Sequence, residues 1–156
     1  MNAAELLGFF DPKLCLFDLK ATSQEEALEE IVAMVAAQTN PKNHGVILEM
    51  LRNRESLGST AVGNGVAFPH GRSLAVSNLM AIFARSQKGV SFSSLDGEPT
   101  HLFFVLLAPP QDRQNQYLPA LGKIIESVKK DALREKLMKV TSFEEFAEVI
   151  QEGAAS

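Results

Sequence analysis

A glycine-rich stretch around one histidine holds the residues of this chain best suited to chemistry. From Arg54 to Arg72 the sequence reads RESLGSTAVGNGVAFPHGR, with His70 near its end and an arginine at either end. The four glycines let the backbone turn tightly and bring its N–H groups close to a ligand, an arrangement suited to an anion. A neutral imidazole among such donors is a good phosphoryl acceptor. The stretch therefore predicts an anion site built around His70.

The same stretch resembles a known active-site sequence. Its runs LGST and GNGVAFPHGR are similar to the pattern L-G-S-T-G-I-G-x-G-V-A-I-P-H, with Ala61 and Phe68 as mild departures. That pattern is typical of the fructose/mannitol/nitrogen-regulatory class of EIIA proteins, which includes EIIA-Ntr, in the bacterial phosphoenolpyruvate-dependent phosphotransferase system. The resemblance covers essentially the whole chain. It implies a phosphocarrier that accepts phosphate on His70 from the small carrier HPr or a paralogue such as NPr, which Enzyme I charges from phosphoenolpyruvate.

Phosphoryl transfer to histidine sets requirements that further residues could meet. It needs an unprotonated ring nitrogen and groups that stabilise charge on the equatorial oxygens. Imidazole, with an ordinary pKa of about 6.5, is mostly neutral at cytoplasmic pH, and we expect its second nitrogen to donate to a backbone carbonyl. Arg54 lies sixteen residues before His70, the spacing at which the resemblance places an active-site arginine. The other phosphate-binding candidates in the stretch are hydroxyl, guanidinium or backbone groups: Ser59, Thr60, Gly63, Gly65 and Arg72.

The chain departs from the resemblance at a second histidine, which EIIA proteins of this class usually place across the site. The position forty-six residues beyond His70 is Gln116, and no histidine follows His101. Glutamine can hydrogen-bond a phosphate but carries no proton and no positive charge. Gln116 is therefore a further phosphate-binding candidate, and its presence favours a regulatory output of the EIIA-Ntr type. The alternatives are a sugar-specific EIIA that passes phosphate to an EIIB, and a non-catalytic regulator that binds proteins.

Several classes of function are disfavoured. The chain lacks the GxxxxGK[ST] of a nucleotide-binding P-loop, and its histidines His44, His70 and His101 have no metal-ligand spacing, so we expect neither cofactor nor metal. A formal net charge of −4 with scattered basic residues argues against nucleic-acid binding. No apolar run is longer than that at residues 102–108, which is far shorter than the roughly 20 residues that span a bilayer, and the first residues do not resemble a signal peptide. We expect a cytoplasmic protein; the sequence specifies no oligomeric state.

Length and hydrophobic periodicity predict the fold. The 156 residues predict one domain over the whole chain. Apolar residues 101–108 indicate a strand buried on both faces, hence central in a sheet that helices cover. The single Cys15 is expected to be a buried apolar side chain. Other strands are expected at residues 14–19, 66–68 and 79–85, and helices at 2–10, 22–38, 43–56 and from about 114, 131 and 142 onward. This mixture predicts an α/β protein, a three-layer α/β/α sandwich on a mixed sheet, which is also the EIIA fructose/mannitol-type fold that the resemblance implies.

Overall fold

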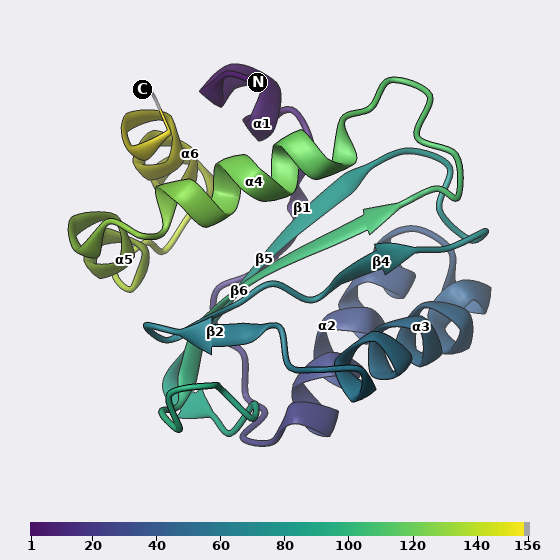
Figure 1. The fold of residues 1–156 in the computed structure, drawn as a ribbon, viewed down its shortest axis with the longest axis horizontal. Coiled ribbons are helices and arrows are strands. Elements are labelled where there is room, and N and C mark those ends of the chain that lie inside the picture. The colour runs from purple at the N-terminus through teal and green to yellow at the C-terminus, as the bar shows by residue number, and fades with distance from the viewer. Residues whose placement is uncertain (155–156) are drawn as a thin grey trace.

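The apolar run at residues 102–108 lies in the central strand β6 (Thr100–Ala108) of a mixed sheet (Figure 1). The structure is a computed structural model, and it describes residues 1–154. The sheet order is β1-β5-β6-β3-β2, and the sixth strand, β4, also pairs with β6. β5 pairs with β6 antiparallel, whereas β3 and β4 pair with it in parallel. The other strands are β1 (Phe10–Leu16), β2 (Ala61–Gly63), β3 (Val66–Ala67), β4 (His70–Arg72) and β5 (Met80–Val90).

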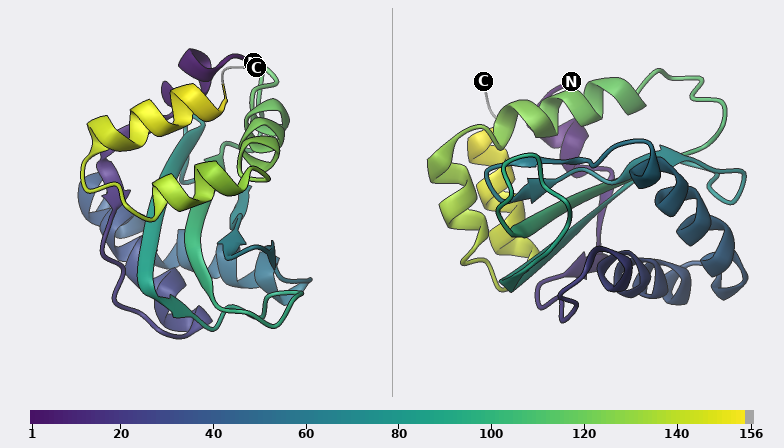
Figure 2. Two further views of the ribbon diagram at one scale, coloured as in Figure 1. Left: turned by 90° about the vertical axis from the view of Figure 1, so that its left-hand side faces the viewer. Right: turned by 60° about the horizontal axis from the view of Figure 1, so that its bottom comes forward.

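Helices cover both faces of the sheet, which confirms the predicted three layers (Figure 2). One layer consists of α2 (Gln24–Gln38) and α3 (His44–Ser56), joined by the short helix η1 (Pro41–Asn43). The other consists of α1 (Ala3–Leu7), α4 (Tyr117–Ser127), α5 (Asp131–Leu137) and α6 (Phe143–Gly153). Within the described residues, no helix is both long and apolar enough to cross a bilayer.

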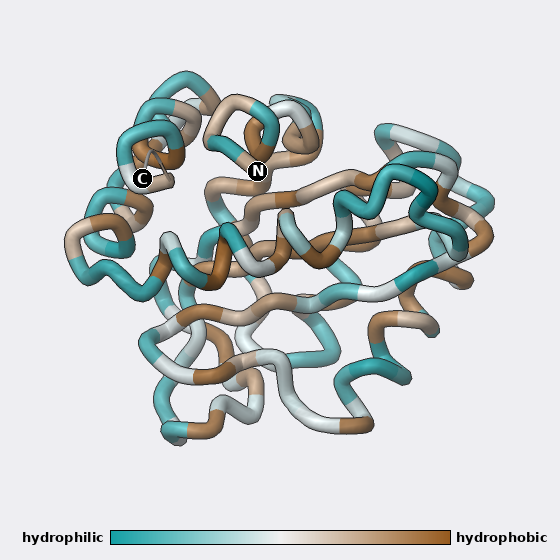
Figure 3. The backbone as a smooth tube through the Cα atoms, turned by 45° about the horizontal axis from the view of Figure 1, so that its top comes forward, coloured by the Kyte–Doolittle hydropathy of each residue, from teal (hydrophilic) through white to brown (hydrophobic). Residues whose placement is uncertain are grey.

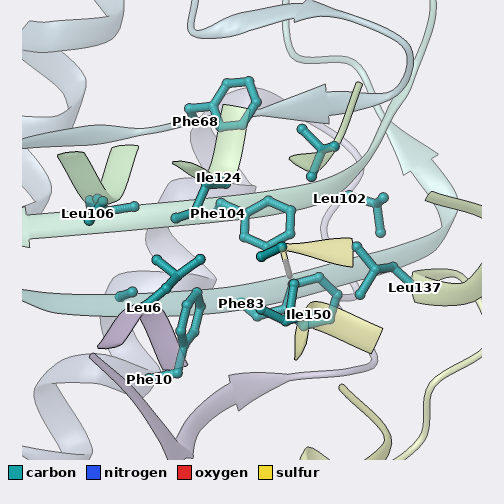
Figure 4. Close-up of a cluster of buried hydrophobic side chains, with 14 of the residues drawn as sticks. Leu6, Phe10, Phe68, Phe83, Leu102, Phe104, Leu106, Ile124, Leu137 and Ile150 are labelled. Atoms are coloured by element: carbon teal, nitrogen blue, oxygen red, sulfur yellow. The ribbon is translucent and has the colours of Figure 1, made fainter. Parts of the chain in front are cut away.

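The side chains of β6 point alternately to the two faces of the sheet and so contribute to both hydrophobic cores. Successive strand residues point to opposite faces, so Phe103 and Val105 pack under α2 and α3 while Phe104 and Leu106 pack under α4 and α6. Figure 4 shows the second of these clusters, in which aromatic rings from β1, β5 and β6 meet apolar side chains of α4 and α6. Apolar residues concentrate in the central strands, whereas the helices alternate between apolar and polar positions (Figure 3). The prediction that residues 101–108 are buried on both faces is confirmed.

The N-terminal prediction was wrong in one respect. Phe10 was expected in the first helix, with Asp11-Pro12 ending it, but α1 ends at Leu7 and these residues begin β1. Proline is tolerated there because β1 is an edge strand, and its pairing with β5 is irregular between Phe10 and Cys15. Cys15 is half-buried against the core, and burial raises the pKa of its thiol to about 11.

Two further boundaries differ from the prediction. The strand expected at residues 79–85 continues as β5 to Val90, with an irregularity after Arg85 where Gly89 adopts φ +96° and donates its N–H to the Ser86 hydroxyl. The helix expected from residue 114 begins at Tyr117, after Asn115 with φ +52°. The prediction of helix 43–56 was accurate, since α3 covers His44–Ser56.

Candidate functional site

The short strand β4 positions His70 at an edge of the sheet. Its backbone pairs in parallel with β6, with His70 opposite Leu106, and Figure 1 shows β4 between β6 and α3. The residue between His70 and Arg72 is Gly71, where an added Cβ would lie 2.1 Å from Sδ of Met50 in α3. The absence of a side chain at Gly71 thus lets the Met50 side chain of α3 pack directly against β4. This approach brings the C-terminal half of α3 to the histidine.

The His70 ring is held in one tautomer by the backbone. Its Nδ1 lies 2.5 Å from the carbonyl oxygen of Phe68. Because a carbonyl oxygen can only accept, Nδ1 carries the hydrogen, and Nε2 of the neutral ring keeps its free lone pair. The half-buried His70 lines an open hollow of about 490 Å³. The predicted hydrogen bond to a backbone carbonyl is thus present, and Nε2 is the nitrogen available for chemistry.

Two arginines line the same hollow. Arg54, in the last turn of α3, donates from Nη1 to the carbonyl oxygen of Gly58 at 2.9 Å. Arg72 donates from Nη1 to the carbonyl oxygen of Pro109 at 3.2 Å. Neither forms a salt bridge with a carboxylate of residues 1–154. No direct ion pair therefore occupies either guanidinium group beside His70, which suits an anionic ligand.

Tyr117, which sequence reasoning missed, forms another wall of the hollow. The centroid of the Tyr117 ring lies 6.2 Å from the centroid of the His70 ring. Cζ of Arg72 lies over the face of the Tyr117 ring, 4.8 Å from its centroid. The Asp112 carboxylate accepts the Tyr117 backbone N–H at 2.8 Å, and the pKa of Asp112 is lowered by this bond, by the N–H of Gln116 and by the charge of Arg72. Burial raises the pKa of the Tyr117 phenol, while Arg72 and Arg54 oppose this shift. Tyr117 is therefore a neutral group at physiological pH.

The structure places Gln116 beside the site and not in it. Gln116 precedes α4 and lines a neighbouring hollow of about 270 Å³ together with Asn78 and Asp112. The ring across from His70 is that of Tyr117, the next residue. Helical spacing could have indicated that Tyr117 is buried, because Tyr117, Ala120 and Ile124 lie on one helix face, but not that its ring lies beside His70.

Ser59 and Thr60 make structural contacts away from His70. The Ser59 hydroxyl donates to the carbonyl oxygen of Phe92 at 3.0 Å and accepts the Ala61 N–H at 3.1 Å. Buried Thr60 donates its N–H to Oε2 of Glu55 at 3.0 Å, and its hydroxyl donates to Oε1 of the same carboxylate. None of these groups lines the hollow of His70. They fasten the loop after α3.

Gly63 and Gly65 lie toward the other end of β6. Gly63 ends β2, and Gly65 lies in the turn that joins β2 to β3, where Asn64 and Gly65 both have positive φ, as a tight hairpin requires. β3 pairs with Leu102 and Phe103, whereas His70 pairs with Leu106. At about 3.3 Å per strand residue, roughly 10 Å or more of β6 separates the two pairings. The structure does not bring either glycine to the histidine.

Taken together, the fold and the site define an α/β protein in which one histidine and two arginines line the same hollow. Within residues 1–154, no cluster of His, Cys, Asp or Glu could hold a metal ion. Residues 8–153 match the protein family described as phosphoenolpyruvate-dependent sugar phosphotransferase system, EIIA 2. The chain belongs to this family.

Relatives and solved structures agree with this assignment. The nitrogen regulatory protein of Bradyrhizobium diazoefficiens is 38% identical over 126 residues, which are 81% of each chain. The crystal structure of the nitrogen regulatory protein IIA-Ntr from Neisseria meningitidis has a TM-score of 0.84 and 31% identity, and the match covers 92% of this chain and 97% of that one. The fructose-specific EIIABC component of Bacillus subtilis is 30% identical over 97% of this chain but only 23% of its own length. The resemblance noted in the sequence is confirmed.

Proposed function

We propose that residues 1–156 act as one phosphocarrier domain of the EIIA-Ntr type, which accepts a phosphoryl group on Nε2 of His70 from a phosphorylated HPr-like or NPr-like carrier. The observation that carries the proposal is the hydrogen bond from Nδ1 of His70 to the Phe68 carbonyl oxygen, beside two arginines in one hollow. It leaves an unprotonated nitrogen where positive charge is concentrated. The donors act in the cytoplasm, where we place the reaction.

The proposed step requires only positioning and charge stabilisation. A bond forms between Nε2 of His70 and phosphorus as the bond between phosphorus and the donor histidine nitrogen breaks, so the phosphoryl group moves without water or metal. Charge in such a loose transition state spreads over three equatorial oxygens. Arg54 and Arg72 are the groups that would stabilise it, since both guanidinium groups line the hollow. Nδ1 keeps its proton on the Phe68 carbonyl throughout.

The regulatory output is supported by the relatives and by Tyr117. Two of the similar proteins are named nitrogen regulatory proteins, and one of them matches over 81% of its length. In this chain a neutral phenol lies across from His70, so no second imidazole can share charge or protons with the phosphoryl group. We infer that the phosphorylation state of His70 changes how the protein binds regulatory targets.

A second candidate function is a sugar-specific EIIA that transfers phosphate onward to an EIIB. The 30% identity to a fructose-specific EIIABC component over nearly the whole chain favours it. Onward transfer to a fructose-type or mannitol-type EIIB, at a rate comparable with transfer from HPr, would make this the better assignment.

The test is phosphorylation with purified components. We expect the protein incubated with Enzyme I, HPr and labelled phosphoenolpyruvate to take up one acid-labile phosphate per chain. His70→Ala should take up none, whereas the control variant His44→Ala, which loses the contact of Nε2 with the Glu29 carboxylate at 2.9 Å, should behave as the parent protein does. Absence of uptake by the parent protein, with HPr and NPr each tried as donor, would overturn the proposal.

A further inference from the structure

A single aromatic ring contacts both the acceptor histidine and one of the two arginines. His70 and Arg72 are alternate residues of β4, so their side chains leave the strand on the same side. The ring of Tyr117 lies against both, 6.2 Å from the His70 centroid and 4.8 Å from Cζ of Arg72. No other aromatic ring of residues 1–154 makes such a contact with either side chain.

The two partners in this contact differ in how firmly they are held. Tyr117 is 5% exposed, belongs to the core under α4, and has its backbone N–H fixed by Asp112. Arg72 is exposed, and its side chain has one hydrogen bond, to the Pro109 carbonyl at 3.2 Å. A long arginine side chain with so few anchors samples many rotamers. The ring face, which attracts a guanidinium, therefore restrains the arginine and not the reverse.

We infer that Tyr117 is a positioning residue for phosphoryl transfer: its ring holds the Arg72 guanidinium beside the phosphoryl group on His70. This inference rests on the proposed function and names the residue that organises its site. The role belongs to the ring, so the phenol hydroxyl is not required for it. Arg54 is anchored independently by Gly58 and does not depend on Tyr117.

A positioning role for Tyr117 can be distinguished by experiment from a purely structural role. A ring that only fills the core would change stability when removed, with no link to Arg72. A ring that positions Arg72 makes the effects of the two residues on phosphorylation interdependent, and a double-mutant cycle measures this coupling. Phenylalanine should substitute for tyrosine, because it keeps the ring face.

The experiment measures the initial rate of His70 phosphorylation by Enzyme I, HPr and phosphoenolpyruvate. We expect Tyr117→Phe to stay within about twofold of the parent protein and Tyr117→Leu to be slower by roughly 3- to 30-fold, the range of a cation–π contact. Arg72→Gln should slow the reaction similarly, and the double variant should be no slower than the slower single variant. The control Leu121→Ala loosens the packing of α4 on the same core and should leave the rate unchanged.

A shape-conserving replacement guards against misfolding of the leucine variant. Pentafluorophenylalanine at position 117 keeps the size of the ring but reverses its attraction for a cation, so the rate should fall as in Tyr117→Leu. Rates equal to the parent for both replacements, or fully multiplicative effects in the cycle, would overturn the positioning role while the parent protein still takes up phosphate. Failure of the parent protein itself to take up phosphate would instead defeat the proposed function.

Discussion

The carbonyl oxygen of Phe68 lies 2.5 Å from Nδ1 of His70, two residues further along the chain. This contact settles which ring nitrogen is free, because the carbonyl can only accept a hydrogen bond. It also holds the ring at the edge strand β4, beside the hollow lined by Arg54 and Arg72. The chemistry proposed for the site depends on this one backbone contact.

The phosphoryl group should therefore be attached to Nε2 of His70. Nδ1 is occupied by its hydrogen bond and faces backbone, so attack from it would require the ring to leave Phe68. Nitrogen-15 and phosphorus-31 NMR of the phosphorylated protein distinguish the two positions, with coupling expected at Nε2 alone. A phosphoryl group found on Nδ1 would contradict the tautomer assigned here.

Arg54→Gln should slow phosphorylation of His70 by about 10- to 100-fold, the value of one or two charge-assisted hydrogen bonds. The free energy of unfolding should change by less than about 1 kcal/mol, because Arg54 lies at the helix end and bonds a single loop carbonyl. Initial rates with Enzyme I and HPr and urea denaturation measure the two effects.

The matched control for Arg54 is Arg52→Gln on the same helix. Arg52 forms an exposed ion pair with Glu25 and does not line the hollow of His70. We expect no change in phosphorylation rate and a loss of at most about 0.5 kcal/mol in stability. An equal slowing in both variants would show that net charge, and not the position of Arg54, controls the reaction.

Thr60→Val tests whether the hydroxyl in the glycine-rich stretch is structural. The variant loses the hydrogen bond to the buried Glu55 carboxylate, so the free energy of unfolding should fall by about 1–2 kcal/mol. The rate of His70 phosphorylation should stay within about twofold, since Thr60 does not line the hollow. A tenfold slower reaction at unchanged stability would return Thr60 to the phosphate site.

The layers of the fold could be predicted from the sequence, whereas part of the site could not. The apolar run at residues 102–108 required helices on both faces, and the spacing of Arg54 at the end of its helix placed that side chain correctly. The contact of Thr60 with Glu55 could not be predicted, because the local pattern of hydroxyls does not reveal which helix face Glu55 occupies.

The positions of Gly63, Gly65 and Tyr117 relative to His70 also differ from what the sequence led us to expect. Gly63 and Gly65 are near His70 in sequence, but the segment between them runs along β6, which carries the glycines away. Tyr117 reaches His70 only because α4 starts three residues later than expected, after the left-handed Asn115. The positions of these three residues relative to His70 depend on tertiary contacts, which the spacing within the glycine-rich stretch does not specify.

Tyr117→His should make phosphorylation depend on pH in a way that the parent protein does not show. Burial raises the pKa of the parent phenol above its usual value of about 10, so the group stays neutral through the physiological range. A histidine would protonate below about pH 6.5, and burial at this position together with the nearby charges of Arg72 and Arg54 would lower that threshold further. The new positive charge would face the phosphoryl group on His70.

The expected result is a relative gain of phosphorylated protein at low pH. At equilibrium with phosphorylated HPr, the ratio of the phosphorylated fractions of variant and parent should rise as pH falls through about 6.5 and level off above about pH 8. Comparison under identical conditions cancels the pH dependence of the donor. A ratio that does not change with pH would mean that residue 117 does not face the phosphoryl group.

Arg85→Met should destabilise the fold without altering the site. Arg85 is 5% exposed and donates to the carbonyl oxygens of Phe17 at 2.7 Å, Leu137 at 3.2 Å and Val140. Burial lowers the pKa of its guanidinium, with the charges of Asp18 and Glu145 opposing the shift. Methionine fills the space but leaves three carbonyls without this donor, so we expect a loss of about 2–4 kcal/mol in urea denaturation.

The rate of His70 phosphorylation should distinguish a loss of stability in Arg85→Met from an effect on the site. Arg85 pairs with Leu102 at the end of β6 remote from Leu106, where β4 and His70 are attached. At a temperature where the variant is fully folded, its phosphorylation rate should equal that of the parent protein. Arg113→Met, in an exposed loop, is the control and should change stability by less than about 0.5 kcal/mol. Unchanged stability of Arg85→Met would contradict the conclusion that this arginine ties the C-terminal helices to the sheet.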